Sequence, residues 1–219
     1  MTKTLYVINP NSNTDVTAGI AAALDPLRSA DGPRIECVTL AEGPLGIQTQ
    51  EDVDRASVLV RQFAELHRDD AAGFVTACFS DPGLHSIREI PGVLALGISE
   101  CGVLTALSMG LRVGVIAILD ISIPRHLRTW AAMGVKDRIV GELAIGRTVA
   151  ELSDRKATLD AMIRTGTTLR DTCHADVLVM GCAGMAPYRQ LLQDAVGLPV
   201  VEPTQAAVAM ALGRLRLGW

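Results

Sequence analysis

The chain has 219 residues, of which 49% are hydrophobic and 20% charged, as expected for a globular protein with one large domain or two smaller lobes. Its net charge is −4 and no cluster of Lys and Arg stands out, which argues against a nucleic-acid partner, because nucleic-acid-binding surfaces need dense positive charge. No apolar run reaches membrane-spanning length and the N-terminus lacks the pattern of a signal peptide, so we expect a cytoplasmic protein with no membrane partner.

Short apolar runs alternate with helical patterns in the first half of the chain. The runs predict four strands, at residues 5–8, 35–40, 73–77 and 93–98. The segments that space their apolar residues as a helix does are residues 14–27, 53–67 and 84–90. This alternation predicts βαβ units and a parallel sheet, which means an α/β fold.

The same plan repeats in the second half. Its predicted strands are residues 113–119, 138–144 (a strand or the edge of a loop), 177–180 and 199–201. Its predicted helices are residues 102–109, 124–133, 149–173, 188–194 and 204–217. Equivalent strands of the two halves are offset by about 104 to 108 residues, although the two halves share little sequence.

We therefore predict two pseudo-symmetric, Rossmann-like lobes, each with a mainly parallel four-stranded sheet, and an active site in the cleft between them. The final helix is expected to cross back to the first lobe. The first lobe would then comprise residues 1–98 and 205–219, and the second lobe residues 99–204.

Two cysteines occupy equivalent positions in the two halves. Cys78 follows the strand at residues 73–77, and Cys182 follows the strand at residues 177–180. Ligands of open parallel sheets bind outside the carboxyl ends of the strands, so we expect both thiols to face one pocket. A thiolate on one side of a carbon acid can remove its proton while a thiol on the other side supplies a new one. The pair therefore predicts inversion of a stereocentre next to a carbonyl group.

Packing is the alternative role for these thiols, because cysteine is among the residues most often buried as core filler. On that interpretation the chain is a two-lobed small-molecule-binding protein without catalytic activity. We assign packing to the other three cysteines, which are Cys37, Cys101 and Cys173. An odd number of cysteines without close pairs argues against a disulfide framework.

Other chemistries lack their sequence signals. The chain has no GxGxxG, no phosphate-binding loop and no GxSxG motif, and its four histidines are too scattered to predict a metal site. Lysine occurs only at Lys3, Lys136 and Lys156, away from the strand ends that face the expected pocket. We therefore expect neither a cofactor nor a metal. Asn9 follows the first strand and either binds a polar substrate group or stabilises the turn.

Three motifs resemble those of a known family. They are Ile-Asn-Pro-Asn-Ser at residues 8–12, Ala-Cys-Phe-Ser-Asp-Pro-Gly-Leu-His at residues 77–85, and Gly-Cys-Ala-Gly-Met at residues 181–185. With their spacing, they resemble the aspartate/glutamate/hydantoin racemase superfamily, and the hydantoin racemases within it most closely. The resemblance extends along nearly the whole chain.

The resemblance implies racemisation without a cofactor, with Cys78 and Cys182 as the catalytic acid and base, and assembly into a homo-oligomer. The residues that it places around the substrate are Asn9, Ile47, Gln48, Phe79, Ser80, Ala183 and Gly184. Ala117 and Ile118 join this set because relatives commonly carry a Thr-Thr or Thr-Ser pair at that place. The missing hydroxyl groups bear on the identity of the substrate more than on the reaction.

The expected reaction is the interconversion of D- and L-5-substituted hydantoins, with allantoin as one example. Amino-acid racemases, maleate isomerases and arylmalonate decarboxylases are the alternatives within the superfamily. Decarboxylases of this kind keep one cysteine, so the pair favours a racemase. An amino-acid racemase needs groups for a free carboxylate and ammonium, and the sequence shows no dedicated acidic or basic residue at the matching positions.

Overall fold

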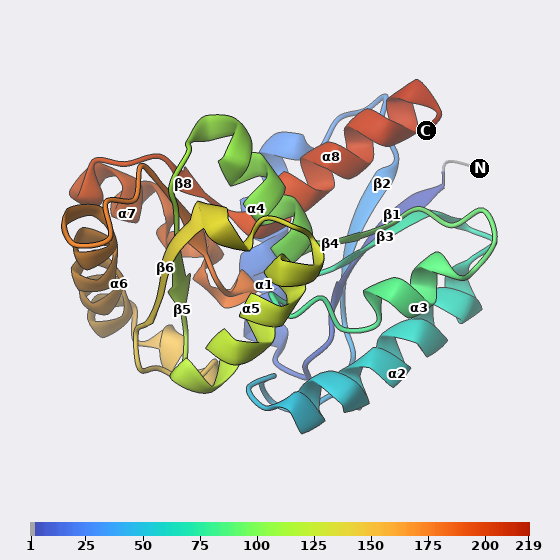
Figure 1. Cartoon of the computed structure of the whole chain (residues 1–219). Helices are drawn as coiled ribbons and strands as arrows, with labels where there is room; N and C mark the ends of the chain where they lie inside the picture. The colour runs from blue at the N-terminus through green and yellow to red at the C-terminus, as the bar shows by residue number, and fades with distance from the viewer. Residues whose placement is uncertain (1–2) are drawn as a thin grey trace.

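The computed structural model describes residues 3–219 and contains two four-stranded sheets, in which all the strand pairs are parallel (Figure 1). The first sheet consists of β1 (Thr4–Asn9), β2 (Arg34–Thr39), β3 (Ala71–Thr76) and β4 (Ala95–Gly97). The second consists of β5 (Val113–Ala117), β6 (Ile139–Ala144), β7 (Val177–Met180) and β8 (Val200–Val201). The strand orders are β2-β1-β3-β4 and β6-β5-β7-β8, so the predicted α/β fold with two equivalent sheets is confirmed.

Eight α-helices connect and cover the strands. They are α1 (Thr14–Ala23), α2 (Gln50–His67), α3 (Leu84–Arg88), α4 (Ile98–Met109), α5 (Ile123–Ala132), α6 (Arg155–Asp171), α7 (Arg189–Val196) and α8 (Pro203–Leu217). Short 3-10 turns lie at η1 (Asp25–Leu27), η2 (Asp120–Ser122), η3 (Lys136–Arg138), η4 (Ala150–Ser153) and η5 (Ala183–Tyr188). No helix within residues 3–219 is both long enough and apolar enough to cross a membrane.

Two helix boundaries differ from the sequence-based expectation for identifiable reasons. The helix predicted at residues 149–173 begins only at Arg155, because the Asp154 side chain accepts the N–H of Ala157 and caps the helix there. The helix predicted at residues 102–109 begins four residues earlier, at Ile98, and takes over the end of the predicted strand. Its first turn has an acidic cap that lies far away in sequence, described below.

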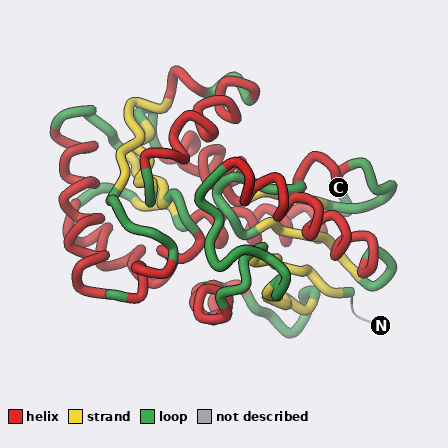
Figure 2. The backbone as a smooth tube through the Cα atoms, turned by 90° about the horizontal axis from the view of Figure 1, so that it is seen from below, coloured by secondary structure: helices red, strands yellow, loops and turns green. Residues whose placement is uncertain are grey.

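The last helix of each half packs on the sheet of the other half. α4 follows β4 of the first sheet and packs against β7 of the second, whereas α8 follows β8 and packs against β3 of the first. The two helices also pack against each other near the middle of the molecule (Figure 1). Seen from below, the strands form two separate groups with helices between and around them (Figure 2). The residue boundaries of the two lobes stay a prediction.

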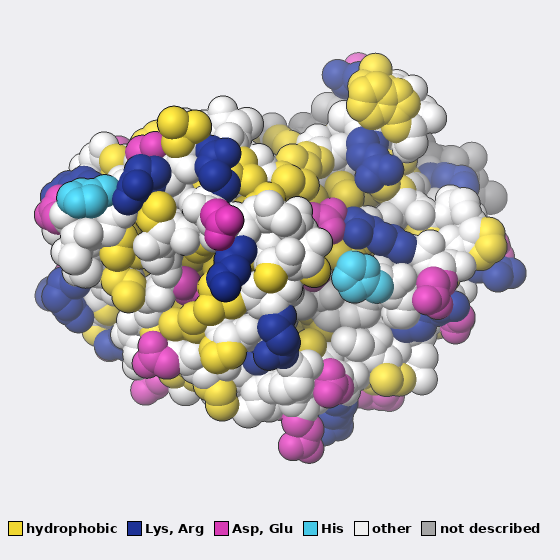
Figure 3. Space-filling model, in the orientation of Figure 1, with side chains coloured by type: hydrophobic (Ala, Val, Ile, Leu, Met, Phe, Trp, Pro, Cys, Tyr) yellow, Lys and Arg dark blue, Asp and Glu magenta, His cyan; other side chains and the backbone are white. Residues whose placement is uncertain are grey.

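One hydrophobic cluster joins the two sheets. Val7 and Val75 pair across the first sheet, Val115 and Val179 pair across the second, and all four are fully buried in the same cluster. The central strands β1 and β5 are buried along their whole length, as expected for parallel strands covered on both faces. On the face shown in Figure 3, basic side chains are interspersed with acidic ones and form no continuous basic patch.

Asp81 ties the turn after β3 to the start of α4. Its carboxylate oxygens each accept a backbone N–H, from Ser99 and from Glu100, both at 2.9 Å. Asp81 has a left-handed φ of 46°, which Asp tolerates better than most residues. These two hydrogen bonds also require glycine at position 97, because a side chain on Gly97 would collide with the Asp81 carboxyl group. Asp81 therefore caps α4 and not α3, the helix that follows it in sequence.

Replacing Asp81 with Ala should destabilise the protein by about 2–3 kcal/mol, because it removes a helix cap and leaves two N–H donors without partners. Urea unfolding at pH 8 measures the change, since burial raises the pKa of Asp81 to about 7 and the carboxylate is ionised there. The matched control is Asp154→Ala, which removes a solvent-exposed cap from α6 and should cost about 1 kcal/mol. Equal losses for the two variants would contradict the role of Asp81.

Candidate active site

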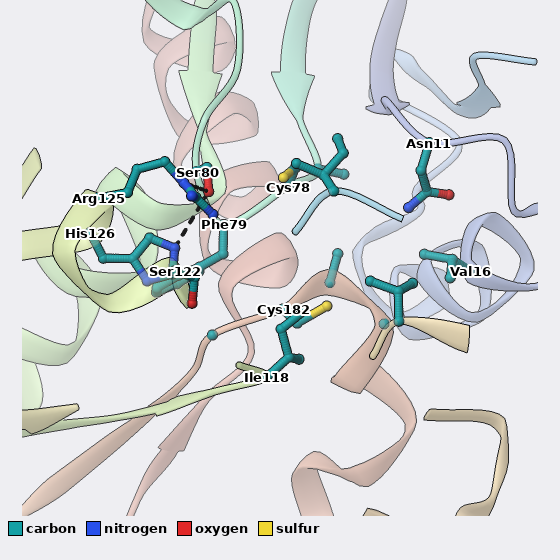
Figure 4. A pocket seen from close by; sticks show the side chains of 16 residues that line it. Asn11, Val16, Cys78, Phe79, Ser80, Ile118, Ser122, Arg125, His126 and Cys182 are labelled. Atoms are coloured by element: carbon teal, nitrogen blue, oxygen red, sulfur yellow. Dashed lines mark hydrogen bonds between the residues drawn. The ribbon is translucent and has the colours of Figure 1, made fainter. Parts of the chain in front are cut away.

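A pocket opens where β3 and β7 end, with an empty volume of about 450 Å³ that includes its mouth. Residues 77–80, after β3, form part of its wall, and residues 181–184, after β7, form another part. Cys78 and Cys182 therefore line one pocket from the two different sheets (Figure 4). This is the arrangement that the carboxyl ends of equivalent parallel strands produce when two such sheets face each other.

The backbone holds the two cysteines in equivalent ways. The residue before each one donates to the neighbouring strand, Ala77 to the Ile8 carbonyl and Gly181 to the Ile116 carbonyl, both at 2.8 Å. Each cysteine carbonyl then accepts the N–H of the residue three positions later, at 2.9 Å for Cys78 and 3.1 Å for Cys182. Each thiol thus sits at the first position of a tight turn that is anchored to a central strand.

Burial keeps both thiols protonated at neutral pH. It raises the pKa of Cys78 to about 12 and the pKa of Cys182 to about 11. In each case the backbone N–H two residues later, of Ser80 or of Gly184, lowers the pKa by hydrogen bonding to the sulfur. A negative charge on Cys182 raises the pKa of Cys78 further, so ionisation of one thiol holds the other one protonated.

Gly184 keeps space open beside one sulfur. A Cβ at this position would lie 3.6 Å from Cys182 Sγ and 3.0 Å from Leu152 Cδ1. Any side chain there would therefore fill the pocket next to the thiol and press on the core behind it.

Arg125 brings a positive charge to the pocket from the third residue of α5. The residue is only 8% exposed. Its Nε donates to Ser80 Oγ at 2.9 Å and its Nη2 donates to the Gln48 carbonyl at 3.3 Å. Within residues 3–219 no carboxylate oxygen lies within 4.0 Å of its guanidinium nitrogens, so Arg125 forms no salt bridge.

The neighbouring His126 links Ser80 to a buried carboxylate. His126 Nδ1 lies 2.6 Å from Glu142 Oε1, and His126 Nε2 lies 3.4 Å from Ser80 Oγ. The ring also meets the edge of Phe79, with the ring centroids 5.2 Å apart. Ser80, on the turn after β3, is therefore held by two side chains of α5 (Figure 4).

The structure brings most of the sequence-predicted site residues together. Eight of them line the pocket: Cys78, Cys182, Ile47, Phe79, Ser80, Ile118, Ala183 and Gly184. Asn9, Gln48 and Ala117 do not. The Asn9 side chain is buried and donates to Asn11, Asn13 and Thr17, so it stabilises the turn, while its neighbour Asn11 lines the pocket. The catalytic and substrate-binding roles of all these residues stay predictions.

Cys101 lies in the core cluster on α4 and does not line the pocket. Burial raises its pKa to about 12. Its position agrees with the packing role expected from the sequence.

Arg125 and His126 were not identified from the sequence as pocket residues. The internal repeat carried the signal, because α1 starts at residue 14 and α5 at residue 123, an offset of 109. Val16, which also lines the pocket, and Arg125 are the third residues of these two equivalent helices. The sequence showed no dedicated basic residue at the positions matching an amino-acid racemase, but the structure supplies one from α5.

Comparison with known proteins relates this chain to racemases. The family model described as Asp/Glu/Hydantoin racemase matches residues 5–211. A hydantoin racemase from Paenarthrobacter aurescens is 27% identical over 219 residues, which cover 98% of this chain and 92% of that protein. An allantoin racemase from Klebsiella pneumoniae has a similar structure, with a TM-score of 0.91 at 27% identity over 99% of this chain and 89% of that one. An allantoin racemase from Pseudomonas fluorescens also gives a TM-score of 0.91, at 26% identity over 98% and 92% of the two chains.

The match to the family model includes both sheets, both cysteine turns and α5. The two allantoin racemase structures cover nearly all of the chain with the same fold. On these grounds, the chain belongs to the Asp/Glu/Hydantoin racemase family.

Proposed function

We propose that this racemase interconverts the D and L forms of 5-substituted hydantoins, allantoin among them, by proton transfer between C5 and the thiols of Cys78 and Cys182. The observation that carries the proposal is the placement of the two thiols, which line one pocket from equivalent turns of two facing sheets. The hydantoin and allantoin racemases among the relatives support the choice of substrate class.

The reaction needs one base and one acid on opposite faces of the ring. The C5 hydrogen is acidic because the carbanion left behind spreads its charge onto the adjacent carbonyl oxygen. A thiolate removes this proton from one face, and the thiol across the pocket gives its proton to the other face. The product is the opposite enantiomer, and thiolate and thiol have exchanged places, so the reverse reaction uses the same pair.

Two features of the pocket support this cycle once one thiol has lost its proton. Each thiolate is stabilised by one backbone N–H, from Ser80 or Gly184. Mutual repulsion opposes a second ionisation, which keeps the acid partner protonated while the base is charged. The proton transfers themselves need no group besides the two thiols.

Removal of either thiol should abolish racemisation. We expect Cys78→Ser and Cys182→Ser each to lower kcat/KM by at least about a hundredfold, because a serine hydroxyl is a much weaker acid than a thiol and forms almost none of the anion that acts as the base. Loss of optical rotation, measured from each pure enantiomer of a 5-alkylhydantoin and of allantoin, reports the rate. Each variant keeps one thiol and is expected to retain C5 proton exchange in D2O for one enantiomer only.

The control for these variants is Cys173→Ser, which replaces a half-buried cysteine outside the pocket and should keep full activity. If either pocket variant racemised both enantiomers at the rate of the unmodified protein, the paired-thiol mechanism would be wrong.

The rate should rise with pH across the neutral and mildly alkaline range. Because burial raises the pKa of the two thiols to about 12 and about 11, both are protonated at pH 7. The fraction of enzyme with one thiolate then grows as pH approaches these values, by about tenfold per pH unit. Initial rates between pH 7 and 9, corrected for racemisation without enzyme, provide the measurement. A kcat/KM that stays constant or falls over this range would show that the active base is already ionised at neutral pH.

A further inference from the structure

Arg125 is a buried cation without an anionic partner. Only 8% of the residue is exposed, yet within residues 3–219 it forms no salt bridge. Buried charges in proteins are normally paired, because the loss of hydration is costly unless an opposite charge replaces the water. An unpaired guanidinium that lines a pocket is therefore suited to an anion that enters with the ligand.

The neighbouring acidic groups are engaged elsewhere. Glu142 pairs with His126 at 2.6 Å. Asp52 accepts the N–H groups of Gln48 and Thr49 at the start of α2, at 3.1 Å and 2.9 Å. Both carboxylates act on Arg125 over a longer range, as do the thiolate form of Cys78 and the positive charge of Arg128 one turn later on α5. Neither carboxylate comes within 4.0 Å of the Arg125 guanidinium.

The guanidinium is oriented and still has donors free. Nε donates to Ser80 Oγ, and Nη2 donates one of its hydrogens to the Gln48 carbonyl. Nη1 makes no hydrogen bond within the described part of the chain. Ser80 is itself held by His126, and His126 by Glu142, so this chain of contacts fixes the position of the arginine fork. An arginine whose Nη1 and Nη2 hydrogens are available matches the two oxygens of a carboxylate.

Arg125 lines the same pocket as the two thiols. Ser80 lies two residues after Cys78, and Figure 4 shows Ser80 between the Arg125 side chain and the two thiols. A 5-substituent that extends toward Ser80 from a ring held between the sulfurs would therefore point to Arg125.

We propose that Arg125 forms an anion subsite that selects hydantoins with a carboxylate at the end of the 5-substituent, as in 5-(carboxymethyl)- and 5-(2-carboxyethyl)hydantoin. This choice of substrate rests on the proposed racemase function. It differs from allantoin, whose ureido substituent is neutral. A neutral substituent leaves the guanidinium without an anion in hydrogen-bonding contact, whereas a carboxylate supplies one.

The test compares 5-(2-carboxyethyl)hydantoin with 5-(2-carbamoylethyl)hydantoin, which have the same shape and differ in charge. For the unmodified full-length protein, kcat/KM for racemisation and Kd from calorimetry should both favour the acid by at least about tenfold. In Arg125→Gln this preference should fall to about one, mainly through KM for the acid. Arg125→Lys keeps the charge without the fork and should retain part of the preference.

Arg128→Gln is the matched control, because it removes an exposed arginine of the same helix that does not line the pocket. It should keep the preference of the unmodified protein. The ratio of the kcat/KM values for the two substrates, taken within one variant, separates a change in selectivity from a general loss of activity through Ser80. If Arg125→Gln fails to fold, the ratio for the unmodified protein decides.

The outcomes separate the two proposals. Racemisation of both compounds without preference for the acid, or a preference that survives in Arg125→Gln, would overturn the anion subsite and leave the racemase function standing. Preferential binding of the acid without racemisation of either compound would support the subsite and overturn the hydantoin racemase function.

Discussion

The exchange of α4 and α8 between the two sheets is the constraint on which the pocket depends. Each helix begins at an acidic cap, Asp81 for α4 and Glu202 for α8, and each packs on the sheet of the other half. The sheets therefore share a core and hold a constant orientation to each other. The distance between the two thiols depends on that orientation, because one follows β3 and the other follows β7. Asp81 connects the cysteine turn to the exchanged helix directly, because it lies three residues after Cys78 and caps α4.

Burial sets the electrostatics of the pocket. It raises the pKa of both thiols, and a single backbone N–H at each sulfur offsets only part of this effect. The same low-dielectric surroundings make any charge influential, so a thiolate at one cysteine holds the other protonated and Arg125 favours the thiolate form of Cys78. In this account, reactivity and selectivity arise from one physical cause, which is the desolvation of the few charged groups in the pocket.

Much of the fold and half of the site could be predicted from the sequence. The strands are short and, apart from the half-buried edge strands β2 and β6, mostly buried, so apolar runs in the sequence indicated them. The common offset between the halves paired Cys78 with Cys182. The partners of Asp81 could not be found in this way, because its donors lie 18 and 19 residues later and meet it only through the tertiary fold. Arg125 was missed for a related reason: it sits in an ordinary amphipathic helix, and a long side chain reaches the pocket from a position that periodicity alone does not distinguish.

The central claim is that two different groups act on the two faces of one carbon. The most direct measurement starts from a pure enantiomer of a 5-alkylhydantoin in D2O and follows deuterium at C5 in both enantiomers during the first few per cent of reaction. With two thiols, the product enantiomer should carry deuterium from the start, because the second thiol has exchanged with solvent, while the remaining substrate keeps its hydrogen. Equal deuterium in the recovered substrate and the product at early times would indicate a single base acting on both faces and would contradict the account.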